Sequence, residues 1–394
     1  MSIITSYISI RTTLKRYCFR SYEIILKLID ELSSSHSQRL DWSEKDCYSM
    51  LEAVGYSFHP LWGVMPDLSK SSIDLSLIIP VYNSEKYLEG CLLSLLQQKS
   101  IFRYELICVN DGSTDDSPRI LERFAMQYPD IIRTVTQENQ GISCSRNKGI
   151  TLARGQYIGF VDNDDLVTPD YVEAFVSEMK KTNADMIQSG YDMIDANGNL
   201  LKTVSKGNCI WTEESNNVEK ERLVRGLPWA GVYKKELFDN VRFPEGFWYE
   251  DMVTRMLLMR KAKKIVIIND VLYHYVMHSS NTYKAIFSSG NIKSVDQYWL
   301  LSQFLKYQTE TMGLSIDDAQ YVVILKELSY LLWGRTKNLP QRLRKAVFCL
   351  ASEIVLTINR HQPLSPDLSK VESSFLNKNF QQWNRVSQIL LVKR

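Results

Sequence analysis

The feature that most constrains this chain is the segment 160–165, which reads FVDNDD. An apolar stretch at 157–161 has the length of a buried strand, and three carboxylates follow at its end. Carboxylates this close repel one another, so the arrangement is costly unless a cation lies among them. Oxygen ligands suit hard divalent ions such as Mg²⁺ or Mn²⁺. Taken alone, the segment also fits a solvated acidic turn ahead of a helix near Pro169.

The composition narrows the class of protein. Of the 394 residues, 44% are hydrophobic and 23% are charged, which is ordinary for a soluble globular chain of two to three domains, or of one domain with appendages. A net charge of +2 gives no reason to expect nucleic-acid binding. Seven scattered cysteines without a CxxC pair predict reduced, mostly buried thiols in a cytosolic protein.

The two ends of the chain leave more than one interpretation open. Basic residues interrupt the apolar positions of segment 1–30, so it lacks a secretory signal, and no apolar run reaches the roughly 20 residues that cross a bilayer. We therefore expect a cytoplasmic protein. The basic segment 11–20 and the apolar stripe of segment 380–391 fit either peripheral contact with the inner face of the membrane or ordinary packing, and we favour packing. Either end could also mediate homo-oligomer formation.

From Leu75 to about Asp195, short apolar runs alternate with segments of helical periodicity. Strands are expected at 75–79, 105–109, 131–136, 157–161 and 185–191, and helices at 85–98, 115–128, 143–153 and 169–181. Repeated βαβ units of this length predict an α/β fold with a mainly parallel sheet covered on both faces.

The later part of the chain is less regular. An Asn-Gly pair within 195–199 predicts a hairpin. Segment 250–261 has helical spacing, and 264–268 and 271–275 read as two strands. We expect segment 1–72 to be mostly helical, with further helices at 295–307, 316–333, 343–358 and 380–391.

Polar residues follow each expected strand of the first half. They occupy segments 80–83, 110–115, 138–141 and 162–165. In open α/β sheets the carboxyl ends of the strands share one edge, and ligands bind there. Asn, Asp, Gly and Ser are also the usual turn formers. Four such turns at one edge, one of them with clustered carboxylates, fit a nucleotide site better than coincidence.

Five segments in this order resemble the family 2 glycosyltransferases: LIIPVYN at 77–83, VNDGSTD at 109–115, NQGIS at 139–143, RNKG at 146–149 and FVDNDD at 160–165. The resemblance covers about residues 75–280. It implies a GT-A fold, in which a Rossmann-like, mainly parallel sheet is flanked by helices. It also implies an enzyme that transfers a sugar from a nucleoside diphosphate, most often UDP, to an acceptor hydroxyl with inversion at the anomeric carbon.

This resemblance divides the chain into three expected parts. A helical N-terminal extension covers 1–72, a GT-A domain covers 73–285, and a helical C-terminal region covers 286–394. The resemblance places the activity in bacterial surface polysaccharide or glycan assembly, with a glycan or a lipid-linked molecule as the acceptor.

The resemblance also implies which residues meet the nucleotide-sugar donor. Asp111 would hydrogen-bond the base, and Arg146 would approach the base or the diphosphate. Gly112 and Ser113 would let the backbone approach the nucleotide closely. The other residues expected to border the donor are Pro80, Tyr82, Asn83, Glu85, Asp162 and Asn163.

By the same resemblance, Asp162 and Asp164 form the motif that holds Mg²⁺ or Mn²⁺. Asp164 would be the direct ligand, and Asp162 would act through water or contact the ribose. His278 follows the last expected strand and is a third candidate ligand, because a histidine or arginine there often meets the metal or diphosphate in the family. A lone histidine is more often a packed or surface residue.

The family's catalytic base belongs to a Glu-Asp pair at the start of a helix, which here is Glu250-Asp251. An acceptor hydroxyl is a poor nucleophile, so a carboxylate must take its proton during the attack. Asp251 is the expected base, with Glu250 orienting it or binding the acceptor, although such a pair also suits the first turn of any helix. Trp229 resembles the family's aromatic residue near the acceptor entrance, where a ring suits sugar stacking, but a buried core tryptophan fits equally well.

Because of two departures from the family pattern, the sequence does not identify the acceptor. Gly231 stands where many relatives carry a lysine, and Val276-Met277 replace an arginine after the last strand. Two other functions are alternatives to this one. A sugar nucleotidyltransferase would favour a glycine-rich basic loop after the first strand, which segment 80–85 lacks. A non-catalytic nucleotide-sugar-binding scaffold is disfavoured because the acidic residues of both motifs are intact.

Overall fold

The computed structural model describes residues 39–62, 73–215, 217–278 and 290–393. The chain forms two compact units. The sheet unit comprises His59–Thr282 and Leu300–Ser315, and the helical unit comprises Met1–Phe58, Tyr283–Trp299 and Ile316–Arg394. Sequence from both sides of the expected GT-A domain thus contributes to the helical unit. The six described cysteines are free thiols, as expected.

The first half of the sheet is parallel and regular. Its strands are ordered β3-β2-β1-β4, and their pairings run without a register shift. All residues of β1 are buried because helices cover the sheet on both faces. The four strands predicted here are confirmed, with the bounds Leu75–Val81 (β1), Tyr104–Asp111 (β2), Ile132–Gln137 (β3) and Tyr157–Phe160 (β4).

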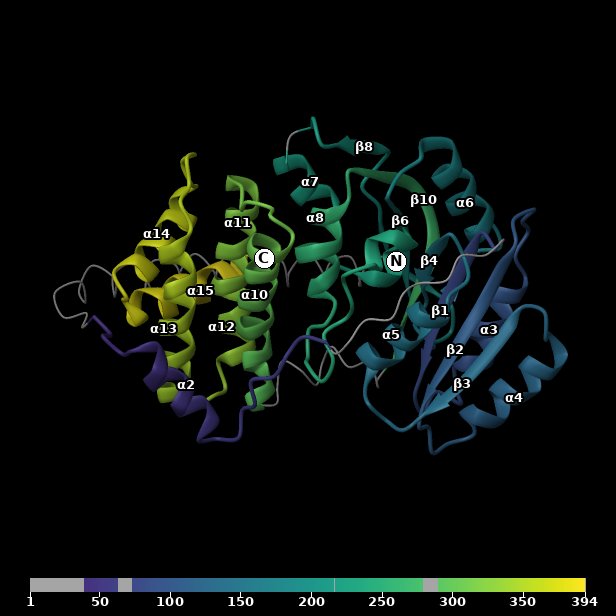
Figure 1. Ribbon diagram of the computed structural model, residues 1–394, viewed down its shortest axis with the longest axis horizontal. Coiled ribbons are helices and arrows are strands. Elements are labelled where there is room, and N and C mark those ends of the chain that lie inside the picture. Colours follow the sequence, from purple (N-terminus) through teal and green to yellow (C-terminus); the bar gives the residue numbers. More distant parts are fainter. Residues whose placement is uncertain (1–38, 63–72, 216, 279–289, 394) are drawn as a thin grey trace, which may run out of the picture. The chain divides into compact units, whose positions relative to one another are not determined.

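Helices cover both faces of this half, as predicted. Figure 1 shows α5 on one side of strands β1 to β3 and α3 and α4 on the other. Gly149 of α5 lies directly against β1, because a Cβ at this position would come within 2.3 Å of the Ile78 side chain. The helices span Leu88–Leu96 (α3), Ser117–Gln127 (α4), Ile142–Leu152 (α5) and Tyr171–Thr182 (α6).

A buried carboxylate ties the amino ends of this half together. Glu105 of β2 is fully buried and accepts hydrogen bonds from Ser76 Oγ at 2.7 Å and from the Arg154 backbone N–H at 2.7 Å. Arg154 Nε and Arg133 Nη1 also donate to it, at 2.8 and 3.2 Å. Burial alone would raise the pKa of Glu105, but these hydrogen bonds outweigh burial and the pKa lies below its ordinary value.

The second half of the sheet mixes strand directions. The order continues β4-β9-β6-β10-β5, with β9 antiparallel to both of its neighbours and β10 parallel to β6. The hairpin predicted at 195–199 is confirmed by the antiparallel β6–β7 pair. The strands are Leu166–Val167 (β5), Met186–Asp195 (β6), Leu200–Val204 (β7), Cys209–Thr212 (β8), Gly231–Lys234 (β9) and Lys264–Met277 (β10).

The structure differs from the predicted elements in this half. The two strands expected at 264–268 and 271–275 are one strand, β10, whose register against β6 shifts between Ile267 and Val271 and again before Tyr273. Strand β9 was not predicted. It begins at Gly231, where a Cβ would lie 2.1 Å from the carbonyl oxygen of Ile187. That close approach gives a structural reason for glycine at this position.

Three short helical elements connect these strands, and the helix predicted at 250–261 is built differently from an ordinary α-helix. Its centre is the π-helix η3 (Thr254–Leu258), which continues into α8 (Met259–Lys261). A π-turn inside a helix is often found at functional sites. The connecting elements are α7 (Asn217–Leu223), η1 (Pro228–Ala230) and η2 (Lys235–Phe238).

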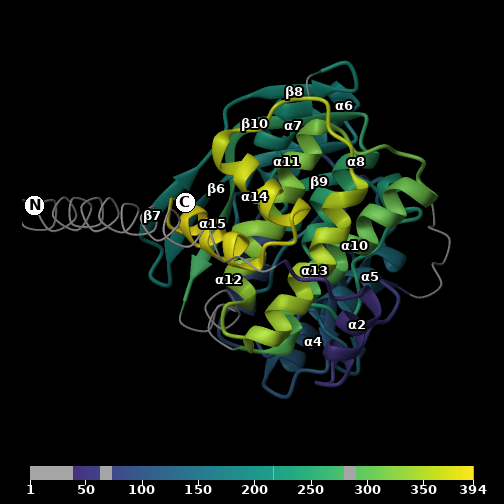
Figure 2. The same cartoon turned by 90° about the vertical axis from the view of Figure 1, so that its left-hand side faces the viewer.

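The helical unit packs around aromatic side chains. Trp383 of α15 is fully buried, and its Nε1 donates to the Leu328 carbonyl at 3.0 Å. Figure 2 looks onto these helices, with α2 beside α13. Their bounds are Glu44–Glu52 (α2), Asp318–Lys326 (α11), Glu327–Leu331 (η6), Leu332–Thr336 (α12), Gln341–Thr357 (α13), Pro366–Leu376 (α14) and Phe380–Lys393 (α15).

The elements η4 (Ile292–Val295), α10 (Asp296–Lys306) and η5 (Tyr307–Thr311) complete the described chain. The apolar stripe predicted near the C-terminus lies on α15, where Trp383 and Val386 are buried within the helical unit. No described helix is both long and apolar enough to cross a bilayer. Most of the expected segment 1–72 lies outside the described residues.

Candidate active site

Side chains join the carboxyl ends of β1 and β2. Asn83 adopts a left-handed backbone with φ of 47°, and its Oδ1 accepts from the Thr114 N–H at 2.8 Å. The Asn83 N–H donates to Ser113 Oγ at 3.1 Å. Glu85 Oε2 accepts from the Asp116 N–H at 3.0 Å. These predicted donor-site residues therefore also fix the two loops against each other.

The tips of β1 and β4 are joined in the same way. Asn163 Nδ2 donates to the Pro80 carbonyl at 2.7 Å, which ties the acidic turn to the end of β1. Tyr82, two residues after Pro80 in the chain, has 48% of its surface exposed. An exposed ring at the strand edge is available to stack against a planar ligand such as a nucleobase.

The Asp111 carboxylate organises the loop that leads into α5. Its Oδ1 accepts from Gln137 Nε2 and from the Gln140 N–H, both at 2.9 Å, and its Oδ2 accepts from the Gly141 N–H at 2.8 Å. A base could use only the acceptor capacity that these bonds leave. Next to it, Gly112 has a φ of +70°, and a Cβ there would come within 2.9 Å of the Asn139 backbone nitrogen.

The acidic turn after β4 is anchored by its third carboxylate. Asp165 is fully buried, and it accepts from Tyr273 Oη at 2.7 Å and from the Val276 N–H at 2.8 Å. Tyr273 Oη in turn accepts from the Asp162 N–H at 3.2 Å. Burial, followed by the charges of Asp162 and Asp164, raises the pKa of Asp165 well above its ordinary value. Asp165 thus attaches the turn to β10, while the side chains of Asp162 and Asp164 stay partly exposed, by 24% and 25%.

Arg146 of α5 connects the acidic turn with the Glu-Asp pair. Its Nη2 lies 3.1 Å from Asp162 Oδ1, and its Nη1 lies 2.9 Å from Glu250 Oε1. The guanidinium carbon lies 5.1 Å from the centre of the Phe243 ring, and the side chain is only 3% exposed. Burial alone would lower the pKa of Arg146, but the charges of Asp162 and Glu250 raise it. Burial raises the pKa of Asp162, although Arg146 opposes that shift.

The adjacent Asn147 holds the segment that precedes the Glu-Asp pair. Its Nδ2 donates to the Phe243 carbonyl at 2.9 Å and to Glu245 Oε1 at 2.8 Å. Its Oδ1 accepts from the Phe243 N–H at 2.9 Å. Two consecutive residues of α5 therefore reach both the metal motif and the expected base segment.

The backbone at the expected base is unusual. Tyr249 has a φ of 65°, which is rare for a bulky residue and strained. Glu250 and Asp251 follow it, both half-buried, and the Asp251 carbonyl accepts from the Thr254 N–H at 3.0 Å. This hydrogen bond leads directly into the π-helix. Strained residues persist where surrounding contacts fix them, and they concentrate at active sites.

The structure brings His278 to the acidic turn. Its Nε2 lies 2.8 Å from Asp164 Oδ2, its ring stacks on Tyr87 with centroids 4.3 Å apart, and its side chain is 6% exposed. Within the described chain, no three acidic, thiol or imidazole groups converge tightly enough to form a metal site on their own. Mg²⁺ is usually held by one or two carboxylates together with substrate phosphates. The partly exposed Asp162 and Asp164 fit that kind of site.

Trp229 lies in the core of the sheet unit. It is 7% exposed and stacks on Tyr273 and Tyr275 at 4.6 and 5.7 Å, with Tyr191 edge-on at 4.9 Å. Only a small part of its surface is available to a ligand. The stack supports β10, the strand that holds the acidic turn. Trp229 therefore makes its main contacts with other side chains of the protein and not with a ligand-accessible surface.

Sequence reasoning missed four residues that shape this site. They are Asn147, Asp165, Tyr249 and Tyr273. Asn147 and Asp165 lie in the segments 146–149 and 160–165, in which the sequence pattern assigned roles only to neighbouring residues. Their place inside these segments was the signal that the sequence offered. Tyr273 was read only as part of a strand, and no local pattern distinguishes a residue with positive φ such as Tyr249.

Known proteins with similar sequences identify the family of this chain. Residues 76–242 match the sequence model of glycosyl transferase family 2. Glycosyltransferase GlyG of Streptococcus pneumoniae is 34% identical over 225 residues, which cover 54% of this chain and 74% of that protein. The uncharacterized glycosyltransferase EpsJ of Bacillus subtilis is 32% identical over 307 residues, which cover 73% of this chain and 87% of that protein.

The solved structures agree with the sequence matches. The crystal structure of S. aureus TarS residues 1–349 in complex with UDP-GlcNAc matches with a TM-score of 0.52 over 80% of this chain and 91% of that one, at 18% identity. The fold is therefore the GT-A fold, as predicted. The chain belongs to glycosyl transferase family 2, and it is a glycosyltransferase.

Proposed function

We propose that this enzyme transfers a sugar from a nucleoside diphosphate, UDP in the first place, to an acceptor hydroxyl with inversion at the anomeric carbon. The observation that carries the proposal is the Arg146 bridge. It joins Asp162 of the acidic turn to Glu250 of the Glu-Asp pair at 3.1 and 2.9 Å, so the two motifs belong to one site. The GT-A structure of TarS with UDP-GlcNAc supports a UDP donor by analogy.

In this proposal the residues at the strand edge bind the nucleotide. Tyr82 offers its exposed ring to the base, and Asp111 orders the loop that faces it. Asp164 would hold Mg²⁺ or Mn²⁺ directly through a carboxylate oxygen, as hard divalent ions prefer, and Asp162 would act through water or contact the ribose. His278 orients Asp164 through the 2.8 Å contact. It is also the third candidate ligand of the metal. A cation bound there would supply positive charge to offset the charge that develops on the leaving diphosphate.

Asp251 acts as the general base. An acceptor hydroxyl attacks the anomeric carbon from the side opposite the diphosphate, and Asp251 removes its proton as the bond forms. The bond between the anomeric carbon and the diphosphate oxygen breaks in the same step, and the nucleoside diphosphate leaves as an anion. Glu250 is held by Arg146 at 2.9 Å and keeps the adjacent Asp251 in position. The hydrogen bonds from Asn147 to the segment 243–245 support the same alignment.

The acceptor is proposed to be a glycan or a lipid-linked molecule in bacterial surface polysaccharide assembly on the cytoplasmic side. The support is a relative from Bacillus spizizenii that is named poly(ribitol-phosphate) beta-glucosyltransferase and is 31% identical over 219 residues, which cover 54% of this chain and 33% of that protein. The particular sugar and linkage depend on side chains of segment 185–280, where this chain departs from the family pattern at Gly231.

Two measurements test the proposal together. Calorimetric titration with UDP, with and without Mn²⁺, is expected to give binding that Mn²⁺ strengthens about tenfold or more. Hydrolysis across a panel of nucleotide sugars then identifies the donor, and NMR of the transferred product is expected to show an inverted anomeric configuration. Metal-independent UDP binding, or retained configuration, would contradict the proposed mechanism.

A further inference from the structure

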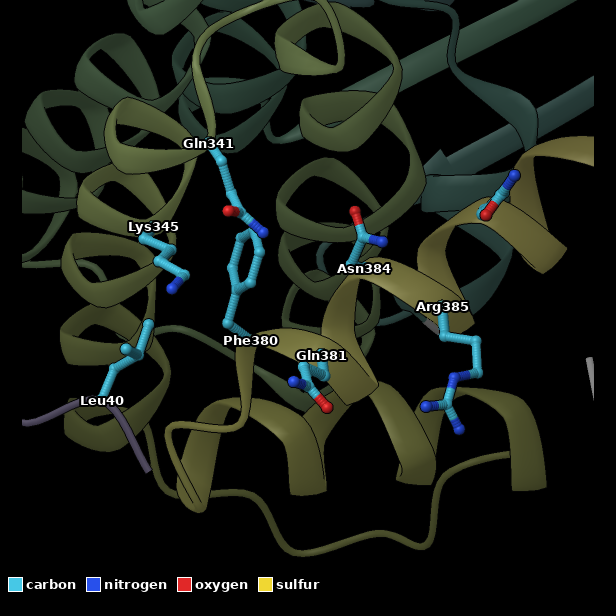
Figure 3. Close-up of a pocket in the computed structure, with 8 residues that line it drawn as sticks. Leu40, Gln341, Lys345, Phe380, Gln381, Asn384 and Arg385 are labelled. Atoms are coloured by element: carbon cyan, nitrogen blue, oxygen red, sulfur yellow. The ribbon is translucent and has the colours of Figure 1, made fainter. Parts of the chain in front are cut away.

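Two features outside the residues assigned so far could bind a ligand. One is a cavity of about 380 Å³ in the helical unit, formed mostly by α13 and α15 and lined by Lys345 and Phe380 among others (Figure 3). The other is a group of basic side chains in the sheet unit. The acidic turn and the Glu-Asp pair belong to the same compact unit as this group, so the group can be related to the proposed reaction.

The basic group consists of Lys206, which follows β7, Arg222 of α7, and Arg225, which follows α7. We call these three side chains the basic cluster. Lys206 Nζ donates to the Arg222 carbonyl. Arg225 Nη2 donates to the Val204 carbonyl at 3.4 Å, so the loop after β7 and the end of α7 lie against each other. Within the described chain, no member of the cluster forms an ion pair with a carboxylate.

The positive charge of the cluster is not balanced by nearby acids. Burial lowers the pKa of Lys206, and so do the charges of its two neighbours in the cluster and of Arg255. The buried Glu221 of α7 is already paired, with Arg255 at 3.2 Å and with Arg260. Glu219 of the same helix is exposed and forms no ion pair with any described residue. Like charges that lie this close repel one another, so a bound anion would stabilise the cluster.

An aromatic ring connects the cluster with Trp229. The guanidinium carbon of Arg225 lies 5.3 Å from the centre of the Tyr191 ring, and that ring meets Trp229 edge-on at 4.9 Å. Arg225 is fixed on β6, because its Nη1 donates to the Ser189 carbonyl at 2.9 Å and its backbone N–H donates to Gln188 Oε1 at 2.8 Å. The cluster therefore lies beside the aromatic stack around Trp229.

The same part of the chain packs against the helix of the expected base. Figure 1 shows α7 next to α8, and Arg255 Nη2 donates to the Glu221 carbonyl at 2.9 Å. A Cβ at Gly226 would lie 3.5 Å from the Arg255 Cβ. Arg255 belongs to the π-helix η3, which begins shortly after Asp251. The cluster thus flanks the two features expected on the acceptor side, the base helix and the aromatic stack.

The members of the cluster are suited to an oxyanion. A guanidinium presents donors in a fork that matches phosphate and carboxylate, and an ammonium adds a point charge. Two carbonyl oxygens hold the half-buried guanidinium of Arg225 in place and leave its remaining N–H groups for a ligand. Lys206 and Arg222 are exposed and can adjust to the ligand. A neutral sugar would leave the repulsion among the three cations unrelieved.

The donor diphosphate is expected elsewhere, at the acidic turn. Tyr273 contacts Asp165 of that turn, and ring contacts continue from Tyr273 through Trp229 to Tyr191, on which Arg225 lies. Three aromatic rings therefore stand between the acidic turn and the guanidinium. An anion at the cluster belongs to the second substrate.

We propose that the basic cluster binds a phosphate or a carboxylate of the acceptor, so that the enzyme transfers its sugar to an anionic glycan or polyol chain. This inference rests on the proposed function and narrows the class of acceptor. The anionic group of the acceptor lies at Arg225, Arg222 and Lys206, while a hydroxyl of the same molecule reaches Asp251. The cluster adds affinity and orientation and takes no part in the bond changes.

Calorimetric titration of the full chain tests the proposal, in the presence of UDP and Mn²⁺ and again without them. The probes are an oligo(glycerol phosphate), an oligogalacturonate of similar length, neutral maltohexaose and inorganic sulfate. We expect at least one anionic oligomer to bind about tenfold or more tightly than both maltohexaose and sulfate. The oligomer that binds more tightly identifies phosphate or carboxylate as the charge. Failure of both oligomers to bind, or equal affinity for maltohexaose or for sulfate, would overturn the proposal.

Substitutions locate the binding. Lys206→Gln and Arg222→Gln are each expected to weaken binding of the preferred oligomer about threefold to tenfold. Lys206→Arg keeps the charge and should retain most of the binding, which a role in packing alone would not predict. Lys181→Gln changes an exposed cation of α6, 3.0 Å from Glu178, and should have no effect. Equal losses in Lys181→Gln and Lys206→Gln would assign the binding to general surface charge and overturn the site.

The affinity for UDP separates this inference from the proposed function. It is expected to stay within about twofold in Lys206→Gln and Arg222→Gln, because the cluster is assigned to the acceptor. A matching loss of UDP affinity would move the cluster to the donor and overturn the inference. If the wild type binds an anionic oligomer but shows no Mn²⁺-dependent UDP binding, the proposed mechanism fails while the anion site stands. If UDP binds as expected and neither oligomer binds, only the inference fails.

Discussion

The two halves of the sheet differ in how they position their functional groups. In the half formed by β1 to β4, pairing runs in constant parallel register, and turn residues at the strand tips carry the side chains proposed to bind the donor. In the half formed by β9, β6 and β10, the register shifts, and the expected base follows a residue with a φ of 65° and precedes a π-helix. The first half orders itself locally, whereas the second depends on side chains from the first.

Arg146 and Asn147 of α5, which packs on the first half of the sheet, hold the loop that carries the expected base. They contact Glu250, Glu245 and the backbone of Phe243. Their presence on one helix explains how the strained loop is held, and in the proposed mechanism these contacts keep the carboxylates of Glu250 and Asp251 in place. This dependence predicts that substitutions of Asp251, Asp164 and Asn147 will lower activity by different amounts. It also predicts that they will change different quantities among kcat, donor KM and the affinity for UDP.

The largest effect is expected at the base. Asp251→Asn keeps the shape of the side chain but cannot accept the acceptor proton, so kcat should fall by about 10²–10⁴-fold. UDP binding should stay within about twofold because the donor half is untouched. Single-turnover transfer and UDP calorimetry check this. Asp270→Asn, at an exposed position of β10, is the control, and joint loss of transfer and UDP binding would make Asp251 structural.

The metal motif should show the next largest effect. Asp164→Asn removes a charged oxygen ligand, so transfer should fall about 10²-fold and Mn²⁺ should no longer strengthen UDP binding. Turnover measured against Mn²⁺ concentration, with EDTA as the metal-free reference, checks both parts. Asp170→Asn changes a nearby exposed carboxylate and should behave as wild type. Activity of Asp164→Asn that persists in EDTA would contradict the metal role.

A smaller effect is expected at the support between the halves. Asn147→Leu keeps the volume but removes the hydrogen bonds to Phe243 and Glu245, so kcat should fall about tenfold through misplacement of the base. The donor KM should change little. Steady-state kinetics separate the two constants, and Lys148→Gln, at the exposed next position, serves as the control. A rise in donor KM with unchanged kcat would place Asn147 on the donor side instead.

The smallest effect on catalysis is expected at Glu105, which acts only on stability. Glu105→Gln leaves the partly exposed Arg133 and Arg154 without their buried counter-charge and should lower the free energy of unfolding by about 1–3 kcal/mol. The kcat of the folded enzyme should not change. Thermal unfolding and kinetics on the same preparation check both statements. A fall in kcat at full folding would link Glu105 to the site.

The same residue gives a pH dependence. Its pKa is lowered in the folded chain, so its ionised form stabilises the fold above the ordinary glutamate pKa of about 4.3. That contribution is lost as the pH falls through the lowered pKa. Melting temperatures of the wild type should therefore drop more steeply below pH 5 than those of Glu105→Gln. Parallel curves would show that Glu105 titrates alike in both states.

How much could be predicted from the sequence follows the same division. The first four strands and their polar tips were readable because apolar runs and turn residues act locally. Strand β9 could not be predicted from local sequence. The glycine at its start, Gly231, is required because the backbone carbonyl of Ile187, in a strand distant in sequence, lies too close for a Cβ. The contacts of Asp165 with Tyr273 and Val276 span more than 100 residues, and no local pattern signals them.

The bridge that Arg146 forms between two carboxylates has a consequence for any mutational scan of this enzyme. Asp162 and Glu250 stand in different motifs, yet each takes one arm of the same guanidinium. Losing one partner frees that arm and changes the field at the other, so their energetic effects should not add in a double-mutant cycle. A scan that scores the two motifs independently would count one arginine twice.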